Sequence, residues 1–319
     1  MPEKPFGRTL VVRGGALGDF LLTLPAISSL RASSQHLEIL GYPSFVELAR
    51  DRDAVDAGRS IEYAPLAGFF ARGAIHDPAL RDYFASFHLV VSYLYDPDGI
   101  FAENLKAAGV KRFVQGPHKP SGRSHAIDEL STPLRELGVG LLAKAERLGP
   151  PQTASRQPVI ALHPGSGSRT KNWASLKWRG LAEQILAAHP ETRLAVIGGE
   201  ADTEEVDALN TLRQNPRIEF WENLLLRELA GRLELACGYI GHDTGVSHLA
   251  AALGVPCLLL FGPTDPAIWA PPHEHVEILR APDNDLSQLG VPNVLAAVTK
   301  LWGPGLLASA RQNQQHPGS

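Results

Sequence analysis

The amino-acid sequence predicts an α/β protein made of two doubly wound domains, and two observations support this prediction. Short apolar segments without polar alternation are separated by amphipathic segments, which is typical of parallel sheets covered by helices on both faces. A stretch rich in Pro, Ser and Gln at residues 148–158 divides the 319 residues nearly in half. We therefore expect domains at residues 1–150 and 158–305 that face a central cleft, followed by a disordered tail at residues 306–319.

The expected strands are apolar segments bounded by turn-forming residues. They lie at residues 9–13, 37–42, 88–94 and 112–116 in the first half, and at residues 159–165, 194–199, 238–245 and 256–263 in the second. Amphipathic helices are expected between them, for example at residues 19–33 and 176–189, with a closing helix at residues 291–302. No segment recurs at a fixed period, so a solenoid is not predicted.

The composition narrows the classes of function. With 44% hydrophobic and 20% charged residues, the chain is expected to fold as a soluble protein. A net charge of −4 does not favour nucleic acid as a partner. No apolar run is long enough to cross a bilayer, and the first residues, MPEKPFGR, lack the apolar stretch of a secretory signal. We therefore expect a cytoplasmic protein.

The cysteines and histidines do not predict a metal site. Cys237 and Cys257 lie far apart without CxxC spacing, so they are expected to be buried apolar groups in a reducing compartment. His273 and His275 resemble a metal-binding pair, but no third ligand stands at a useful spacing. We expect neither a metal nor a cofactor.

The segment RGGALGDFLLTLP at residues 13–25 forms a glycine-rich turn between the first expected strand and a helix. In open α/β sheets, ligands bind at this carboxyl edge. A dinucleotide-binding G-x-G-x-x-G pattern is incomplete because Arg13 occupies the first glycine position, and no carboxylate ends the next strand, so a nicotinamide-dependent dehydrogenase is disfavoured. Asp19 has two interpretations. A helix cap is the simpler one, and a general base is the functional one.

The segment HPGSGSRTKNW at residues 163–173 places a Gly/Ser loop and a lysine between a strand and a helix. It is not a Walker A loop, because no Gly-Lys-Ser/Thr follows the glycines. Backbone N–H groups and the Lys171 ammonium would nevertheless suit a diphosphate. The loop residues concerned are Gly165, Ser166, Gly167 and Ser168. The alternative is a plain β–α loop with an exposed lysine.

The segment starting at Asp243 opens a helix that ends at Gly254. We expect Asp243 to cap this helix while the backbone of Thr244 and Gly245 meets a phosphate. His248 lies in the first turn, where a lone histidine is more often structural than catalytic. Glu200 follows the strand at residues 194–199, where a carboxylate either holds ribose hydroxyls or simply begins a helix.

Four segments of the chain resemble glycosyltransferase family 9, the ADP-heptose:lipopolysaccharide heptosyltransferases. They are GDFLLTLPAISSLR (18–31), HPGSGSRTKNW (163–173), IGGE (197–200) and DTGVSHLAAALGVPCLLLFGPTDP (243–266), in the order found in the family. The resemblance implies a GT-B fold of two Rossmann-like domains and an inverting transfer that needs no bound metal. It implies ADP-heptose as the donor, a lipopolysaccharide core sugar as the acceptor, and action at the cytoplasmic face of the inner membrane, with peripheral membrane contact.

The resemblance also implies roles for particular residues. Asp19 matches the catalytic base, and Lys171 matches the lysine that stabilises the departing diphosphate. The Asp243-Thr244-Gly245 segment matches the phosphate-binding motif, and Glu200 matches the acid that holds the donor ribose. The Gly/Ser loop and His248 are placed with the donor.

Acceptor binding is expected in the first domain. Gly18 lies beside the expected base, and Arg72, Lys119 and Arg123 lie in loops that mix aromatic and basic residues. Such loops suit a phosphorylated glycolipid or glycan. For each of these residues, a solvated loop position is the alternative.

Two alternatives to the heptosyltransferase interpretation stay open. One is a GT-B transferase that uses another nucleotide sugar and a capsule or other glycan acceptor. The other is a non-catalytic nucleotide-sugar-binding homologue, against which the presence of both Asp19 and Lys171 counts. The linkage formed and the oligomeric state are open.

Overall fold

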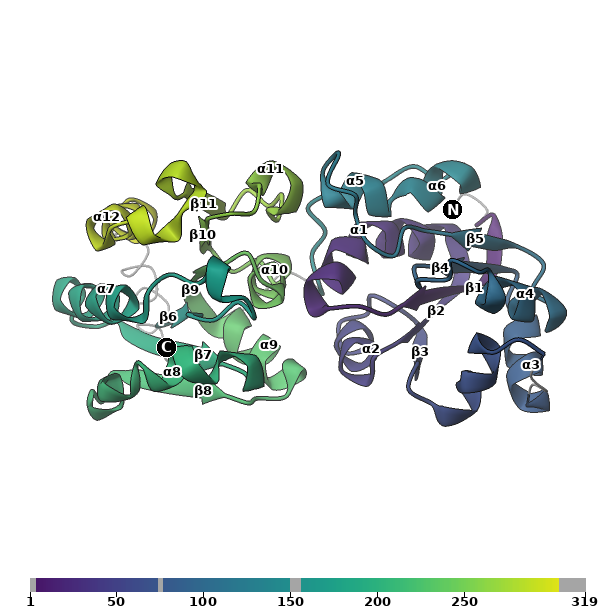
Figure 1. The fold of residues 1–319 in the computed structure, drawn as a ribbon, viewed down its shortest axis with the longest axis horizontal. Coiled ribbons are helices and arrows are strands. Elements are labelled where there is room, and N and C mark those ends of the chain that lie inside the picture. The colour runs from purple at the N-terminus through teal and green to yellow at the C-terminus, as the bar shows by residue number, and fades with distance from the viewer. Residues whose placement is uncertain (1–3, 74–76, 150–155, 304–319) are drawn as a thin grey trace, which may run out of the picture. The chain divides into compact units, whose positions relative to one another are not determined.

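The computed structural model describes residues 4–73, 77–149 and 156–303, which form two compact units, Met1–Gly149 and Pro150–Ser319 (Figure 1). Each unit is a parallel sheet covered by helices. The tail predicted at residues 306–319 lies outside the described residues. Among the described helices, none combines the length and the apolar character needed to cross a membrane.

The N-terminal unit contains a five-stranded parallel sheet in the order β3-β2-β1-β4-β5. Its strands are β1 (Phe6–Arg13), β2 (Ser34–Gly41), β3 (Ala57–Ser60), β4 (Leu89–Ser92) and β5 (Phe113–Gln115). Its helices are α1 (Leu17–Ser33), α2 (Pro43–Arg50), α3 (Pro78–Ala85), α4 (Ile100–Ala107), α5 (Ala126–Leu130) and α6 (Thr132–Leu137), with a 3-10 helix η1 (Ala64–Phe70). The chain changes direction across the sheet between β1 and β4, which are neighbours.

The C-terminal unit contains a six-stranded parallel sheet in the order β11-β10-β9-β6-β7-β8. Its strands are β6 (Gln157–Leu162), β7 (Arg193–Gly198), β8 (Ile218–Glu222), β9 (Ala236–His242), β10 (Cys257–Phe261) and β11 (Val276–Arg280). Its helices are α7 (Ser175–Ala188), α8 (Thr203–Asp207), α9 (Leu226–Leu235), α10 (Gly245–Ala252), α11 (Pro266–Trp269) and α12 (Val291–Trp302). Short 3-10 helices are η2 (Arg169–Lys171), η3 (Glu200–Asp202), η4 (Asn210–Gln214), η5 (Pro282–Asn284) and η6 (Leu286–Gln288).

This six-strand order is that of a doubly wound dinucleotide-type fold, and its change of direction falls between β6 and β9. The predicted α/β class with parallel sheets is confirmed in both units. The closing helix predicted at residues 291–302 is also confirmed as α12.

Helix α1 differs from its prediction as an amphipathic helix, because most of its residues are buried. It packs on β1 and β2 and also against α5 and α6, so several of its faces are covered. A helix enclosed in this way has no need for a polar stripe. Burial begins at Phe20, and the first turn, which carries Asp19, is only partly buried.

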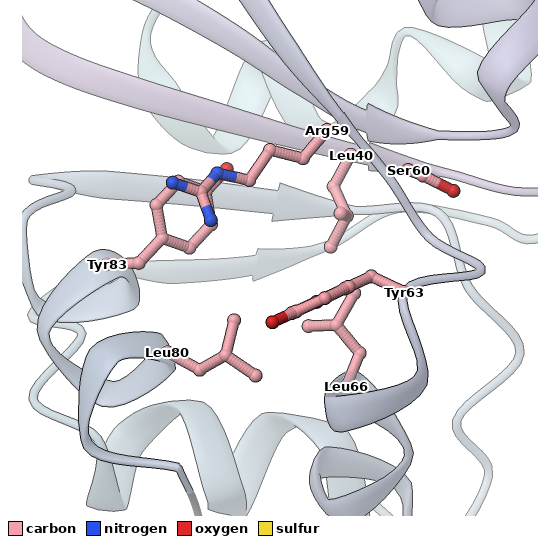
Figure 2. A pocket seen from close by; sticks show the side chains of 7 residues that line it. All are labelled: Leu40, Arg59, Ser60, Tyr63, Leu66, Leu80 and Tyr83. Carbon is pink, nitrogen blue, oxygen red and sulfur yellow. The ribbon is translucent and has the colours of Figure 1, made fainter.

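An apolar cavity of about 250 Å³ adjoins the carboxyl ends of β2 and β3 in the N-terminal unit (Figure 2). It is lined by Leu40, Arg59, Ser60, Tyr63, Leu66, Leu80 and Tyr83. The Arg59 guanidinium lies over the Tyr83 ring, 4.0 Å from the ring centroid. Four of the lining residues belong to the hydrophobic core of this unit, whereas Tyr63 is exposed, so the cavity opens to the surface. Its apolar walls do not resemble a diphosphate site.

Candidate functional site

The candidate donor site lies where the C-terminal sheet changes direction. Strands β6 and β9 are paired in parallel, with Leu162 opposite Ile240, so their carboxyl ends are adjacent. The loop that follows β6 carries Lys171, and the residues that follow β9 carry Asp243. Open α/β sheets bind ligands at such a point.

Lys171 and Asp243 are brought together by this topology. The Lys171 Nζ donates a hydrogen bond to the Asp243 carbonyl oxygen at 2.9 Å and lies 3.7 Å from the carboxylate Oδ2. The His248 Nε2 lies 3.9 Å from the other carboxylate oxygen. Burial raises the pKa of Asp243, but the favourable interactions of its carboxylate with the nearby His248 and Lys171 outweigh burial and leave this pKa below its ordinary value. Asp243 is therefore an anionic anchor for the ammonium group.

Helix α10 begins next to this ion pair. Its N-cap is Thr244, whose hydroxyl accepts a hydrogen bond from the Ser247 N–H at 3.2 Å. The prediction that Asp243 caps the helix is therefore wrong: the carboxylate faces Lys171 and His248, and the cap stands one residue later. The first N–H groups of a helix have no acceptor within the helix, so those of Gly245 and Val246 are suited to phosphate oxygens.

A buried hydrogen-bond network holds these strand ends together. The His163 Nε2 lies 3.3 Å from the Asp202 carboxylate, and its Nδ1 lies 3.3 Å from the Tyr239 hydroxyl and 3.4 Å from the Thr244 hydroxyl. The Tyr239 hydroxyl is also 3.0 Å from the Ser247 hydroxyl. Burial raises the pKa of Asp202, but its hydrogen bond with His163 and the backbone N–H groups that it accepts outweigh burial and lower this pKa. The network thereby joins the ends of β6, β7 and β9.

Asp202 also explains a glycine in the loop after β6. A Cβ atom on Gly165 would lie 1.9 Å from the Asp202 Oδ1, so a larger residue would push the carboxylate away. Gly165 is buried, so the close packing against Asp202 leaves no room for a side chain at this position. Further along, the Ser166 hydroxyl donates to the Ser168 carbonyl at 2.8 Å, which fixes the loop internally.

Three of the other predicted donor residues line a polar cavity of about 400 Å³. Gly167 and Ser168 from the loop after β6 meet Glu200 from the start of η3. The remaining lining residues are Arg169, Asn172, Ala201, Thr203, Glu204 and Glu205. Carboxylates accept hydrogen bonds from hydroxyl groups, so this cavity suits a sugar or ribose. Gly167, Ser168 and Glu200 thus lie at this cavity, and Lys171, Asp243, Thr244, Gly245 and His248 lie together at the start of α10, whereas Gly165 and Ser166 belong to neither group.

In the N-terminal unit, Asp19 occupies the third position of α1, and Ala16 is the N-cap. The Asp19 Oδ2 accepts a hydrogen bond from the Ala16 N–H at 3.2 Å. The prediction of Asp19 as the N-cap residue is therefore wrong in position, although its carboxylate does bind a free N–H at the helix start. The other oxygen, Oδ1, lies 3.9 Å from the Arg13 Nη2. The Asp19 side chain is 30% exposed, so a substrate hydroxyl can reach it.

The residues predicted for acceptor binding are only partly brought together. Gly18 directly precedes Asp19 in the first turn of α1. Lys119 is exposed and follows His118, whose carbonyl accepts a hydrogen bond from the Arg13 Nη1 at 3.1 Å, so this loop lies beside the end of β1. Arg72 is exposed after η1, in a separate segment.

The loop that carries Arg123 is organised by the Glu129 carboxylate. Glu129 accepts hydrogen bonds from the backbone N–H groups of Arg123 and Ser124 at 3.0 and 3.1 Å. Desolvation acts to raise the pKa of Glu129, but these and further hydrogen bonds outweigh it and lower this pKa to about 2. The Arg123 Nε donates to the Ser121 hydroxyl at 3.0 Å. His125, in the same loop, caps α5 by accepting from the Ile127 N–H at 3.2 Å.

Within the described residues, no three His, Cys, Asp or Glu side chains cluster in a way that could hold a metal ion. The His275 Nε2 lies 2.9 Å from the Ala251 carbonyl oxygen, so this ring nitrogen is hydrogen-bonded within the protein. Cys237 and Cys257 are buried free thiols. Burial raises the pKa of the Cys237 thiol to about 11, so this thiol behaves as an apolar group.

Sequence reasoning missed the residues that hold the site. Arg13 stood out only as a departure from a glycine pattern, and His163, Asp202 and Tyr239 had no predicted role. His163 contacts Asp202 and Tyr239 across 39 and 76 positions, so spacing along the chain does not reveal these contacts. The available signal was that His163 directly follows a strand, at the edge where ligands bind.

Comparison with known proteins identifies the family of the chain. The sequence profile of "Glycosyltransferase family 9 (heptosyltransferase)" matches residues 128–297, more than half of the chain. Lipopolysaccharide heptosyltransferase 1 of Pseudomonas aeruginosa is 38% identical over 108 residues, which are 34% of this chain and 29% of that relative, so the chain aligns with less than a third of its length. Lipopolysaccharide heptosyltransferase 3 of Escherichia coli is 22% identical over 89% of this chain and 96% of that relative.

The solved structure "E. coli heptosyltransferase WaaC with ADP" superposes with a TM-score of 0.71 at 20% sequence identity, covering 92% of this chain and 99% of that chain. The fold and these comparisons define the class of protein, which is a glycosyltransferase of the GT-B fold. The chain belongs to glycosyltransferase family 9, the heptosyltransferase family.

Protonation of His242 is expected to weaken the C-terminal unit. Burial and the neighbouring His163 lower the pKa of His242 to about 3, and the His242 Nε2 accepts the Trp173 N–H at 2.9 Å. As the pH falls below about 6.5, His242 binds a proton in the unfolded chain but stays neutral in the folded chain until about pH 3. The free energy of unfolding therefore decreases from about pH 6.5 towards pH 3. The His242→Gln variant lacks this contribution. Urea unfolding of both proteins should show that the free energy of unfolding of the wild type, relative to that of the variant, decreases as the pH is lowered from 6.5 towards 3. An equal dependence on pH in the two proteins would contradict the assignment.

Proposed function

We propose that this protein is an inverting glycosyltransferase that moves a heptose from ADP-heptose to a hydroxyl group of a lipopolysaccharide core or related glycan acceptor. The observation that carries the proposal is the Lys171 ammonium bound to the Asp243 carbonyl, beside the start of α10. A cation and free helix N–H groups at one strand edge suit the diphosphate of a nucleotide sugar. Family membership supports heptose as the sugar, and the ADP bound by the similar E. coli heptosyltransferase supports adenosine diphosphate.

In the proposed reaction, the acceptor oxygen attacks the anomeric carbon as the bond from that carbon to the diphosphate oxygen breaks. The diphosphate departs with the electron pair of that bond. Lys171 and the N–H groups of Gly245 and Val246 offset the negative charge that develops on it. These groups supply the positive charge that a bound metal ion would otherwise supply, so the proposed transfer proceeds without a resident metal.

Asp19 is the proposed general base, which takes the proton of the acceptor hydroxyl as its oxygen attacks. Its Oδ2 is held by the Ala16 N–H, and its carboxylate is 30% exposed, as a group that must meet a substrate requires. Attack on the face opposite the leaving diphosphate inverts the anomeric centre. The product is a glycoside with ADP as the second product.

The remaining predicted residues are assigned by the class of group that they suit. Glu200 is proposed to accept hydrogen bonds from the donor ribose, because it lines the polar cavity with Gly167 and Ser168. The exposed Arg72, Lys119 and Arg123 are proposed to meet anionic groups of a glycolipid acceptor. Such an acceptor would place the enzyme in the cytoplasm, in peripheral contact with the inner membrane.

Replacement of Asp19 by Asn tests the base. The amide oxygen keeps the hydrogen bond to the Ala16 N–H but cannot take a proton, so the helix start is preserved while the chemistry is lost. Turnover with ADP-heptose and a lipopolysaccharide-core acceptor should fall by roughly 100-fold or more, with donor affinity nearly unchanged. A variant that transfers sugar at the normal rate would show that Asp19 serves only the helix. Asp19→Ala, which removes both roles, completes the comparison.

Replacement of Lys171 by Ala tests the leaving-group assignment. Calorimetric titration with ADP should show weaker binding, by about tenfold or more, since a charge-assisted contact contributes roughly 1.5–3 kcal/mol. Lys300→Ala is the matched control, because Lys300 is 73% exposed and paired with Glu277. Pretreatment of the wild type with EDTA should leave the transfer rate unchanged. Unaltered ADP affinity in the Lys171 variant would remove this residue from the site.

A further inference from the structure

Arg13, the last residue of β1, carries a charge into the interior of the N-terminal unit. Its side chain is only 1% exposed. A buried charge is costly unless other groups compensate it. Burial accordingly lowers the pKa of Arg13, while the nearby Asp19 carboxylate acts in the opposite direction. The position therefore needs an explanation beyond strand formation.

One nitrogen of the Arg13 guanidinium donates hydrogen bonds within the protein, whereas the other two have no hydrogen-bond partner among the described residues. Its Nη1 donates to the His118 carbonyl at 3.1 Å and to the Tyr93 carbonyl at 3.5 Å. Its Cζ lies 5.6 Å from the centre of the Tyr93 ring. Among the described residues, its Nε and Nη2 have no hydrogen-bond partner. The Nη2 is the atom that lies 3.9 Å from the Asp19 Oδ1.

The turn between β1 and α1 leaves room for this pair. Gly15 has φ of +91°, a backbone conformation that favours glycine. A Cβ atom at this position would lie 3.0 Å from the Asp19 Oδ2. The Asp19 carboxylate therefore sits between two fixed groups, with the Ala16 N–H on one oxygen and the Arg13 guanidinium facing the other.

We propose that Arg13 is the positioning residue of the base, holding the Asp19 carboxylate in one orientation from inside the protein. The inference rests on the proposed function, because it assigns the role through Asp19. Arg13 is too buried to touch a substrate, whereas Asp19 is not. Because the guanidinium itself is buried, water screens its charge less than that of a surface arginine, and it attracts the carboxylate correspondingly more. A second, weaker contact on Oδ1 leaves that oxygen free to approach the acceptor hydroxyl when substrate binds.

The test compares Arg13→Met and Arg13→Lys in the wild-type chain and in the Asp19→Asn chain. In the wild-type chain, Arg13→Met should lower kcat by roughly 10- to 100-fold, the loss expected from a misplaced reacting group, with the donor KM unchanged. Arg13→Lys retains the charge and should recover much of the rate. In the Asp19→Asn chain, Arg13→Met should cost nothing further, since the base that it orients is already lost.

Two results would overturn the inference. One is an unchanged kcat for Arg13→Met in a folded protein, and the other is an equal loss in the Asp19→Asn chain, which would indicate a purely structural role. Arg8→Met is the matched control, because Arg8 also lies on β1 and pairs with the buried Glu38, and its kcat should match the wild type. Circular dichroism and urea unfolding verify that the N-terminal unit of each variant is folded, and ADP affinity, which depends on the other unit, should be unchanged.

Failure of the proposed function would be separate and recognisable. A wild-type protein that transfers no sugar from ADP-heptose would overturn the proposed function. The contact between Arg13 and Asp19 would then be tested by measuring the free energy of urea unfolding for the Arg13→Met, Asp19→Asn and double variants. A coupling free energy between the two sites supports the orienting contact, and additive effects on the free energy of unfolding overturn it.

Discussion

The placement of the proposed base, Asp19, and of the Lys171–Asp243 pair depends on the parallel pairing of two strands in each unit, β1 with β4 and β6 with β9. Because these strands run in the same direction, their carboxyl ends meet at one edge, and the chain leaves that edge through loops free of ladder constraints. Lys171 and Asp243, 72 positions apart, therefore come within hydrogen-bond distance. In the N-terminal unit, the same constraint places Arg13 beside the loop that carries His118.

The fold class could be predicted because the central strands are buried on both faces. β9 is buried along its whole length, and such strands read as continuous apolar runs. Three strands were not among the predicted segments, namely β3, β8 and β11. β3 is an edge strand of the five-stranded sheet, and β8 and β11 are the two edge strands of the six-stranded sheet. Edge strands are partly exposed, so their sequences, AGRS, IEFWE and VEILR, mix polar with apolar residues and give no comparable signal.

The candidate site could be predicted only where its residues follow a strand in a short motif. Asp19, Lys171 and the residues from Asp243 to Gly245 were identified in this way. The residues of the buried hydrogen-bond network around them could not be predicted, because the contact between His163 and Asp202 depends on how neighbouring strands are ordered in the sheet. The capping position was misjudged in both helices. At α10 the Asp243 carboxylate faces Lys171, and the cap stands one residue later. At α1 the Asp19 carboxylate does bind an N–H at the helix start, but from the third helical position.

The central claim is that Lys171 and the start of α10, at the carboxyl ends of β6 and β9, bind the diphosphate of an ADP-linked sugar. Thermal unfolding with ADP, UDP, GDP, NAD and ADP-heptose tests it most directly, because a ligand at a hundredfold excess over its dissociation constant stabilises the folded state by about 2.7 kcal/mol. The account predicts selective stabilisation by ADP and ADP-heptose, lost in Lys171→Ala. Stabilisation by UDP or GDP alone would contradict the proposed donor, and stabilisation by NAD alone would contradict the transferase site itself.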